Sequence, residues 1–253
     1  MIARLSVFIG LLVLGSCAAS KKSVKNNLNN TTELLQAMND KYKGKWFDQF
    51  TFVQETIKFD STGNETEKSI WYEAIDYPKK FRIDYGPLSA GNAVIFDKDS
   101  VWVFKENKFV RKAYSPREFL LMKGGLYHLT VDETIQQLED YGYDCSIFRK
   151  DLLNGKPVYV IGAEKDDLKS KQFWIDTEHF YMVRRISTKK KTLDVIYRDH
   201  VFSNGGWVEQ VVEFWVDGVY VQKEYYKEID TNPQLSNDIF DHNMFGKTHW
   251  FKE

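Results

Sequence analysis

Two acid–histidine dyads, Asp199-His200 and Asp241-His242, are the neighbouring residues that could perform proton-transfer chemistry. A histidine held by a carboxylate can act as a general base, but both side chains must then serve the same substrate atom. Side chains adjacent on a strand point to opposite faces of the sheet. We expect residues 192–201 to form a strand, so Asp199 and His200 make a poor catalytic pair.

Two carboxylates, Glu209 and Glu213, lie an even number of residues apart on one expected strand. Such a pair could flank a sugar and divide the acid and base roles of glycoside hydrolysis. Alternating polar residues on a solvent-facing strand explain the spacing better, and we favour that reading. The five histidines show no zinc-binding spacing, and GxSxG and GxxxxGK[ST] motifs are absent from the sequence. We predict a protein that is not an enzyme and needs no metal and no cofactor.

Cys17 carries a different chemistry, because it ends an N-terminal export signal. One positive charge precedes an uncharged apolar run over residues 5–14, which is too short for a permanent transmembrane helix. The following Leu14-Gly15-Ser16-Cys17 resembles the bacterial lipobox, whose cysteine thiol receives a diacylglycerol and becomes the new N-terminus. The alternative is an ordinary secretory peptide with a chance cysteine. We predict residues 1–16 as a lipoprotein signal peptide and Cys17 as the lipidation site.

The segment that follows, residues 17–30, is polar and rich in asparagine, with little apolar surface to bury. This composition is typical of a flexible tether that holds a folded domain away from a membrane. No aspartate follows Cys17, and the tether has no acidic run. We therefore expect an envelope protein that a lipid anchors in the outer membrane, facing the periplasm.

The charge balance excludes one class of partner. Lys and Arg number 35 against 36 Asp and Glu, so a formal net charge of −1 provides no basic field for a nucleic-acid backbone. Aromatic residues make up 15% of the chain, which suits half-buried strands better than an all-helical core. We predict no nucleic-acid partner.

The pattern of apolar residues and turns predicts an α+β domain. Three amphipathic helices are expected: one capped by Asn30, one beginning at Ser115-Pro116 and one beginning with the capping box Thr130–Glu133. Short polar turns separate the strand signals, which indicates antiparallel neighbours. These signals lie at 47–60, 66–76, 81–85, 93–96, 100–105, 108–114, 143–150, 156–163, 171–176, 181–189, 192–201, 207–216 and 219–229.

A sheet of about 11–13 antiparallel strands accumulates twist, so we expect a strongly curved half-barrel with the three helices as its lid. The segments 93–96 and 101–104 are apolar on both faces. Such strands need cover on both sides or a ligand on one. The sequence therefore suggests a cavity inside the curved sheet.

The order of several motifs resembles the LolA/LolB superfamily of periplasmic lipoprotein carriers and outer-membrane lipoprotein-sorting proteins, over roughly residues 31–245. Between an amphipathic first helix and the mid-chain helices, the matching segments are Phe52-Val53-Gln54, Trp71, Pro78, Phe81, 92–97 and 100–104; Phe173-Trp174-Ile175-Asp176 and Asp238-Ile239-Phe240 follow. The resemblance implies that residues 31–253 form a half-barrel whose apolar cavity takes up acyl chains without covalent chemistry.

Strand parity selects the candidate lining of that cavity: Trp71, Phe81, Ile83, Tyr85, Trp102 and Phe104. A structural core with no ligand is the alternative for each of them. A single β-bulge would exchange this set for neighbours such as Val101 and Val103.

Two loop positions bear on how such a cavity would work. Receptor-type relatives carry an exposed apolar residue after the third strand, and Leu88 lies in that loop here, so we expect Leu88 to be exposed and to contact the membrane. The alternative is a Leu88 folded onto the core. Carriers have an arginine immediately before the proline that precedes the third strand, where this chain has Tyr77. An arginine-latched opening of the lid is therefore not expected.

Taken together, these features predict a monomeric, membrane-anchored periplasmic protein that holds lipid or lipoprotein acyl chains and has a role in lipoprotein sorting. The lipobox at Cys17 brings the chain nearer to the receptor-type relatives, because soluble carriers have none. The alternative is an envelope sensor or interaction module on the same fold, without carrier activity.

Overall fold

The structure, a computed structural model, describes residues 28–116 and 118–251. The predicted signal peptide, Cys17 and nearly all of the predicted tether lie outside the described residues. Among those that are described, no helix has the length and apolar character needed to cross a bilayer.

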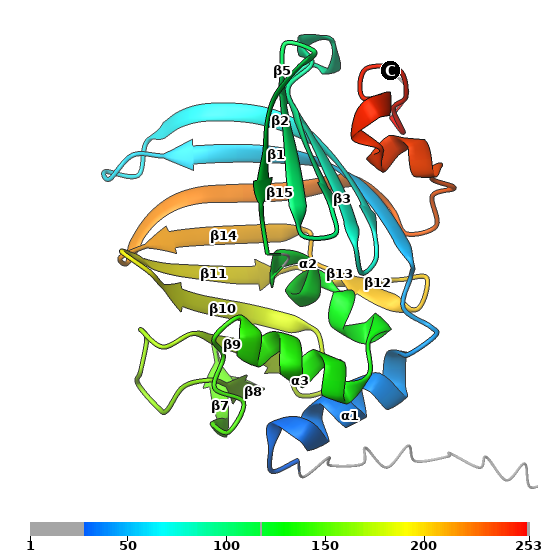
Figure 1. The fold of residues 1–253 in the computed structure, drawn as a ribbon. Helices are drawn as coiled ribbons and strands as arrows, with labels where there is room; N and C mark the ends of the chain where they lie inside the picture. Colours follow the sequence, from blue (N-terminus) through cyan, green and yellow to red (C-terminus); the bar gives the residue numbers. More distant parts are fainter. Residues whose placement is uncertain (1–27, 117, 252–253) are drawn as a thin grey trace, which may run out of the picture.

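One antiparallel sheet of thirteen strands forms most of the fold (Figure 1). Its edge strands are β6 and β7, which do not pair with each other among the described strands. In spatial order the strands are β6 (Lys108–Tyr114), β5 (Ser100–Lys105), β4 (Ala93–Asp97), β3 (Lys80–Tyr85), β2 (Glu65–Asp76), β1 (Gln49–Phe59), β15 (Val219–Asp230), β14 (Val211–Val216), β11 (Thr192–Arg198), β10 (Met182–Thr188), β9 (Gln172–Asp176), β8 (Lys156–Ile161) and β7 (Phe148–Leu153).

Three α-helices lie on one side of this sheet: α1 (Thr31–Tyr42), α2 (Glu118–Lys123) and α3 (Val131–Asp140). Asn30 caps α1 by accepting a hydrogen bond from the Glu33 amide, and Thr130 and Glu133 form the expected capping box of α3. A short 3₁₀ helix, η2 (Gly125–His128), joins α2 to α3. The three predicted helices are therefore confirmed.

The main hydrophobic core lies between these helices and the sheet. Leu34 and Met38 of α1 and Leu138 of α3 are almost completely buried there, in the same hydrophobic cluster as Phe50 and Phe52 of β1. Amphipathic helices bury one stripe in this way, and the sheet provides the matching apolar face. The expected α+β class is thus observed.

Two expected strands are each divided in the structure. The segment 192–201 is broken at Asp199, whose φ of 55° is left-handed, and 207–216 is broken after Val208. The pieces form a separate two-stranded sheet of β12 (Val201–Ser203) and β13 (Gly206–Val208). A left-handed residue cannot continue a β-ladder, which explains the first interruption.

The C-terminal segment covers the opposite face of the sheet near β3 and β4. It contains two 3₁₀ helices, η3 (Asn237–Phe240) and η4 (His242–Met244). Arg82 of β3 donates hydrogen bonds to the carbonyls of Ile239 and Thr248, and Ile239 and Phe240 pack on Ala74. Both faces of this part of the sheet are therefore covered by side chains from other segments.

Candidate functional site

A cavity of about 370 Å³ lies between α2 and the sheet. Aromatic and aliphatic side chains form most of its wall, and a few polar groups lie on the strands at its floor. Its lining residues are Gln54, Trp71, Glu73, Phe81, Ile83, Phe96, Ser115, Pro116, Phe119, Leu120, Phe214, Glu224 and Tyr226. A mainly apolar concavity with a few polar groups is typical of a small-molecule site.

Half of the predicted cavity residues line this space. Trp71, Phe81 and Ile83 do so, and the Phe81 ring packs 5.3 Å from that of Phe119 on α2. Tyr85 lies beside them, because its ring meets Trp71 edge-to-face at 4.9 Å, but it is not part of the lining.

Trp102 and Phe104, in contrast, lie on the opposite face, and their prediction as cavity residues is wrong. Trp102 stacks on His242 at 4.5 Å and Phe104 stacks on Phe245 at 4.1 Å. Both rings therefore support the C-terminal segment instead of facing the cavity.

The strand register explains this reversal. Residues directly opposite each other in an antiparallel pair share a face. Ile83 pairs with Val94, which pairs with Val103, so the cavity face continues through an even-numbered residue of β4 to an odd-numbered residue of β5. Trp102 pairs instead with Ile95 on the other face. Whether odd- or even-numbered residues face the cavity therefore changes at each of these turns, and the sequence pattern alone does not reveal the change.

Leu88 is half-buried, so the expectation that it is exposed is wrong. It begins a 3₁₀ turn, η1 (Leu88–Ala90), and lines a second cavity of about 310 Å³ together with Arg82 and Phe245. Residues 245–249 of the C-terminal segment line this cavity as well. Contact of Leu88 with a bilayer stays a prediction.

The polar floor of the main cavity contains two buried carboxyl groups, Glu73 on β2 and Glu224 on β15, which are 3% and 6% exposed. Burial raises the pKa of Glu73 well above its usual value, and the charge of Lys123 opposes that rise. Burial likewise raises the pKa of Glu224 to about 7. Near neutral pH the floor therefore holds carboxyl groups that a ligand's charge can shift between their neutral and ionised forms.

Lys123, the last residue of α2, connects the helix to this floor. Its Nζ lies 2.5 Å from Glu209 Oε1 and donates to the Tyr226 hydroxyl at 3.0 Å. The Tyr226 hydroxyl in turn lies 3.4 Å from Glu224 Oε2, and Gln222 donates to Glu224 Oε1 at 2.7 Å. With its side chain only 3% exposed, Lys123 is the centre of a buried polar network.

The same network corrects the solvent-facing interpretation of Glu209. Glu209 is 8% exposed and pairs with Lys123, whereas Glu213 pairs with Arg198 at 2.5 Å. The strand expected to carry both glutamates is interrupted between them, so the even spacing does not place them on one continuous strand. Their separate cationic partners give no sign of a shared sugar site.

The sequence reasoning also missed Glu73, Glu224 and Lys123. One signal was present for Glu73, because it stands two residues from both Trp71 and Ile75 and so shares their face of β2. A charged residue at an apolar position of a strand is a candidate for a binding site. Lys123 gave no comparable signal, since it ends a short helix.

Tyr77 fastens the end of α2 to the sheet. Its hydroxyl donates to the Lys123 carbonyl at 3.1 Å, and its ring stacks on His128 at 5.2 Å. Burial raises the pKa of Tyr77 well above its usual value, so the hydroxyl stays neutral. The contact between Tyr77 and the end of α2 is therefore uncharged.

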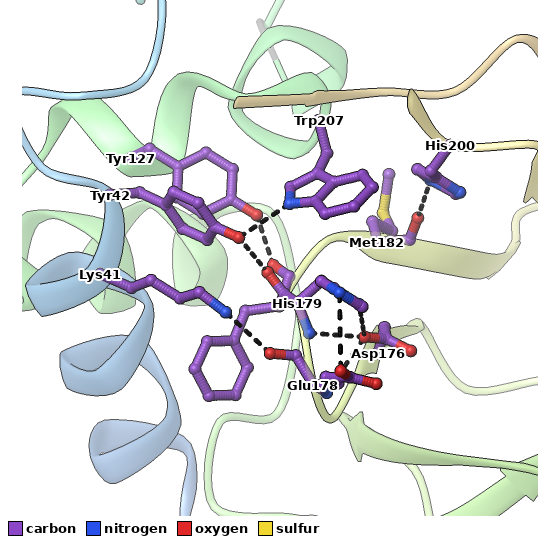
Figure 2. A network of polar contacts seen from close by, with 10 residues as sticks. Lys41, Tyr42, Tyr127, Asp176, Glu178, His179, Met182, His200 and Trp207 are labelled. Carbon is purple, nitrogen blue, oxygen red and sulfur yellow. Dashed lines mark hydrogen bonds and ion pairs between the residues drawn. The ribbon is translucent and has the colours of Figure 1, made fainter. Parts of the chain in front are cut away.

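A second set of hydrogen bonds fastens α1 and η2 to the turn between β9 and β10 (Figure 2). Tyr42 donates to the His179 carbonyl at 2.5 Å, and Tyr127 donates to the Phe180 carbonyl at 2.5 Å. Trp207 donates to the Tyr42 hydroxyl at 3.0 Å, and Lys41 donates to the Glu178 carbonyl at 2.7 Å. These contacts hold the helices against the sheet beyond the cavity.

The histidine of the Asp199-His200 dyad makes contacts that support the fold. His200 stacks on Tyr181 at 3.8 Å and donates through Nε2 to the Met182 carbonyl at 3.0 Å, while burial lowers its pKa. Within residues 28–116 and 118–251, no group of three or more His, Cys, Asp or Glu is arranged to hold a metal ion.

No family model and no curated protein matches the sequence. Solved structures do match the fold. A LolA superfamily protein from Nitrosomonas europaea superposes with a TM-score of 0.56 at 12% identity, covering 85% of this chain and 99% of that one. A DUF1329 family protein from Desulfovibrio piger gives 0.59 at 14%, covering 85% and 97%.

A third solved structure, described as a putative outer membrane lipoprotein-sorting protein domain from Vibrio parahaemolyticus, gives a TM-score of 0.56 at 14% identity, again covering 85% and 97%. At these identities the likeness establishes the fold. The predicted resemblance to the LolA/LolB superfamily is therefore confirmed as a LolA-like fold.

Proposed function

We propose that the sheet forms a half-barrel lidded by the helices, and that its cavity holds an acyl chain of a lipid or lipoprotein. The observation that carries this proposal is the apolar wall of the 370 Å³ cavity between α2 and the sheet, with Trp71, Phe81 and Phe119 among its rings. The LolA-like fold supports it, as does the likeness to the Vibrio domain, which is described as a lipoprotein-sorting protein domain.

Hydrophobic transfer is sufficient to drive such binding. Each methylene group that leaves water contributes about 0.8 kcal/mol, so a medium-length chain gains several kcal/mol before the cost of association. The cavity volume falls within the range of about 300–1,000 Å³ that is usual for ligand sites. No bond needs to form or break, and we propose a binding protein without enzymatic activity, acting as a monomer.

We expect the neutral lipid monolauroylglycerol to bind the purified protein. An Ile83→Glu variant should bind it at least about tenfold more weakly. Ile83 lines the cavity, so a glutamate there places a charge where the chain would lie. Isothermal titration calorimetry below the critical micelle concentration measures both affinities.

Val219→Glu is the matched control for this variant, because Val219 is 41% exposed at the start of β15, away from the cavity lining. Thermal unfolding of both variants verifies that they are folded. A wild-type protein that binds no acyl lipid, or an Ile83→Glu protein that binds as tightly as Val219→Glu, would favour the interaction module instead.

We propose further that Cys17 is lipidated and anchors the protein in the outer membrane, facing the periplasm. Replacing residues 1–17 by an ordinary cleavable secretory signal should move the protein from the membrane to the soluble fraction, because the signal is then removed on export and no diacylglycerol is attached. Membrane fractionation with an antibody against the folded domain measures this change. A protein with this replaced signal that stays in the membrane fraction would disprove the anchor.

A further inference from the structure

The carboxyl group of Glu73 lies without a partner from the described part of the chain at the floor of an apolar cavity. Glu73 is 3% exposed and lines the cavity, yet the residues described in the structure offer it no hydrogen bond and no ion pair. Buried polar groups are almost always hydrogen-bonded, so an unpartnered one that lines a cavity is available to a polar group of a ligand. The chemistry of that group follows from the charges nearby.

Among the residues that the structure describes, acidic groups outnumber basic ones at this floor and directly around it. Glu73, Glu209 and Glu224 act on one another electrostatically, and Lys123 is the cation that offsets them. The ammonium of Lys123 is already committed to Glu209 at 2.5 Å and to the Tyr226 hydroxyl. Glu224 receives hydrogen bonds from Gln222 and Tyr226, which leaves Glu73 as the carboxyl group that lacks a donor among the described residues.

We propose that the cavity binds an amphiphile with an ammonium group on its apolar chain, and that Glu73 is the ion-pair partner of that ammonium. The proposal rests on the proposed function, because the apolar chain would occupy the acyl site between Trp71, Ile83 and Phe119. It adds the polar end of the ligand and the residue that selects it.

An ammonium group fits this floor better than the other polar groups of amphiphiles. A carboxylate or phosphate would find no cation to pair with at Glu73, and an ionised Glu224 would repel it, which is strongly unfavourable for a buried contact. A hydroxyl can hydrogen-bond to Glu73 but does not balance the acidic excess. An ammonium does both, and charge-assisted hydrogen bonds are about twice as strong as neutral ones.

Proton release provides a second signature. Burial holds Glu73 in its protonated form in the empty cavity, because its pKa is raised, and a bound ammonium stabilises the carboxylate instead. Binding of the cationic ligand therefore displaces the Glu73 proton into solvent, while the ligand keeps its own. A neutral ligand of the same length leaves that proton in place.

The test compares dodecylammonium with dodecanol, both below their aggregation limits, by calorimetry at pH 7 in buffers of different ionisation enthalpy. Wild-type protein should bind dodecylammonium about tenfold more tightly than dodecanol and release a proton only with the amine. Glu73→Gln should bind both ligands within about threefold of each other and release fewer protons with the amine than the wild type does, because only Glu224 can then respond to the ligand's charge. Lysophosphatidylethanolamine, added as a third ligand, distinguishes a lipid headgroup from a simple amine as the source of the ammonium.

Glu55→Gln is the matched control. Glu55 lies on the neighbouring strand β1 and is held by Lys68 and Lys227, so this variant should keep the wild-type preference for the amine. Dodecanol binding without any preference for dodecylammonium would overturn this inference and leave the acyl-site proposal intact. Failure of both ligands to bind would instead overturn the acyl site itself.

Discussion

Replacing Lys123 by methionine should destabilise the protein by about 3–5 kcal/mol, the usual cost of leaving one partner of a buried ion pair uncompensated. The substitution keeps an unbranched apolar stem but removes the ammonium that Glu209 contacts at 2.5 Å. It also removes the donor to Tyr226, and with it the link from the end of α2 to the floor of the cavity. Urea unfolding followed by circular dichroism measures the free energy of unfolding.

A second variant keeps this prediction testable if Lys123→Met does not fold. Lys123→Met combined with Glu209→Gln removes both charges and should recover part of the lost stability, because the buried carboxylate is then neutralised as well. Lys68→Met is the exposed control, since Lys68 pairs with Glu55 at the surface and should change the stability by less than about 1 kcal/mol. A loss as small for Lys123→Met as for Lys68→Met would contradict the network described here.

Glu224 should make the protein less stable as the pH rises from about 4.5 to about 7. Burial raises its pKa from the ordinary 4.5 to about 7, so between these values the folded state binds a proton that the unfolded state has released. The stabilisation is complete below pH 4.5 and is lost as the pH rises through about 7. The shift corresponds to about 3 kcal/mol.

Other carboxyl groups change the pH profile in the opposite sense, so the informative quantity is the difference between wild type and Glu224→Gln. The variant should gain about 3 kcal/mol relative to wild type between about pH 4.5 and about pH 8. Glu55→Gln should change in the opposite direction, because hydrogen bonds from Lys227 and Lys68 lower the pKa of Glu55. Urea unfolding at the two pH values measures both, and parallel profiles for wild type and Glu224→Gln would contradict the assigned burial.

The helices and most strands of this fold were predictable because each has a local cause. Asn30 and Thr130 cap helices by hydrogen bonds within a few residues, and hairpin turns such as Asn154-Gly155 adopt positive φ angles that asparagine and glycine tolerate. The interruption at Asp199 was not predictable in the same way. The local sequence does not predict that Asp199 adopts the left-handed conformation there.

The cavity was predictable strand by strand but not across the sheet. Trp71, Phe81 and Ile83 lie on neighbouring strands whose predicted parity was right, and all three line the cavity. Trp102 and Phe104 required the register of β4 with β5, which hairpin geometry decides, and they face the C-terminal segment instead.

The polar floor depends on contacts between segments far apart in the sequence. Lys123 reaches Glu209, 86 residues away, and Tyr226, 103 residues away. No local pattern encodes such a meeting, although the glutamate at position 73 breaks the apolar alternation of β2. For charged residues at core positions of strands, the contacts are therefore known only once the structure is known.

The most direct test of the acyl-chain site is photo-crosslinking with a neutral monoacylglycerol that carries a diazirine on its chain. Purified Cys17→Ala protein is irradiated with the probe, and labelled peptides are identified by mass spectrometry. We predict that the label concentrates on the peptides containing Trp71, Ile83 and Phe119, which surround the cavity. Label found mainly on Trp102 and the C-terminal segment, or no saturable labelling at all, would contradict the account.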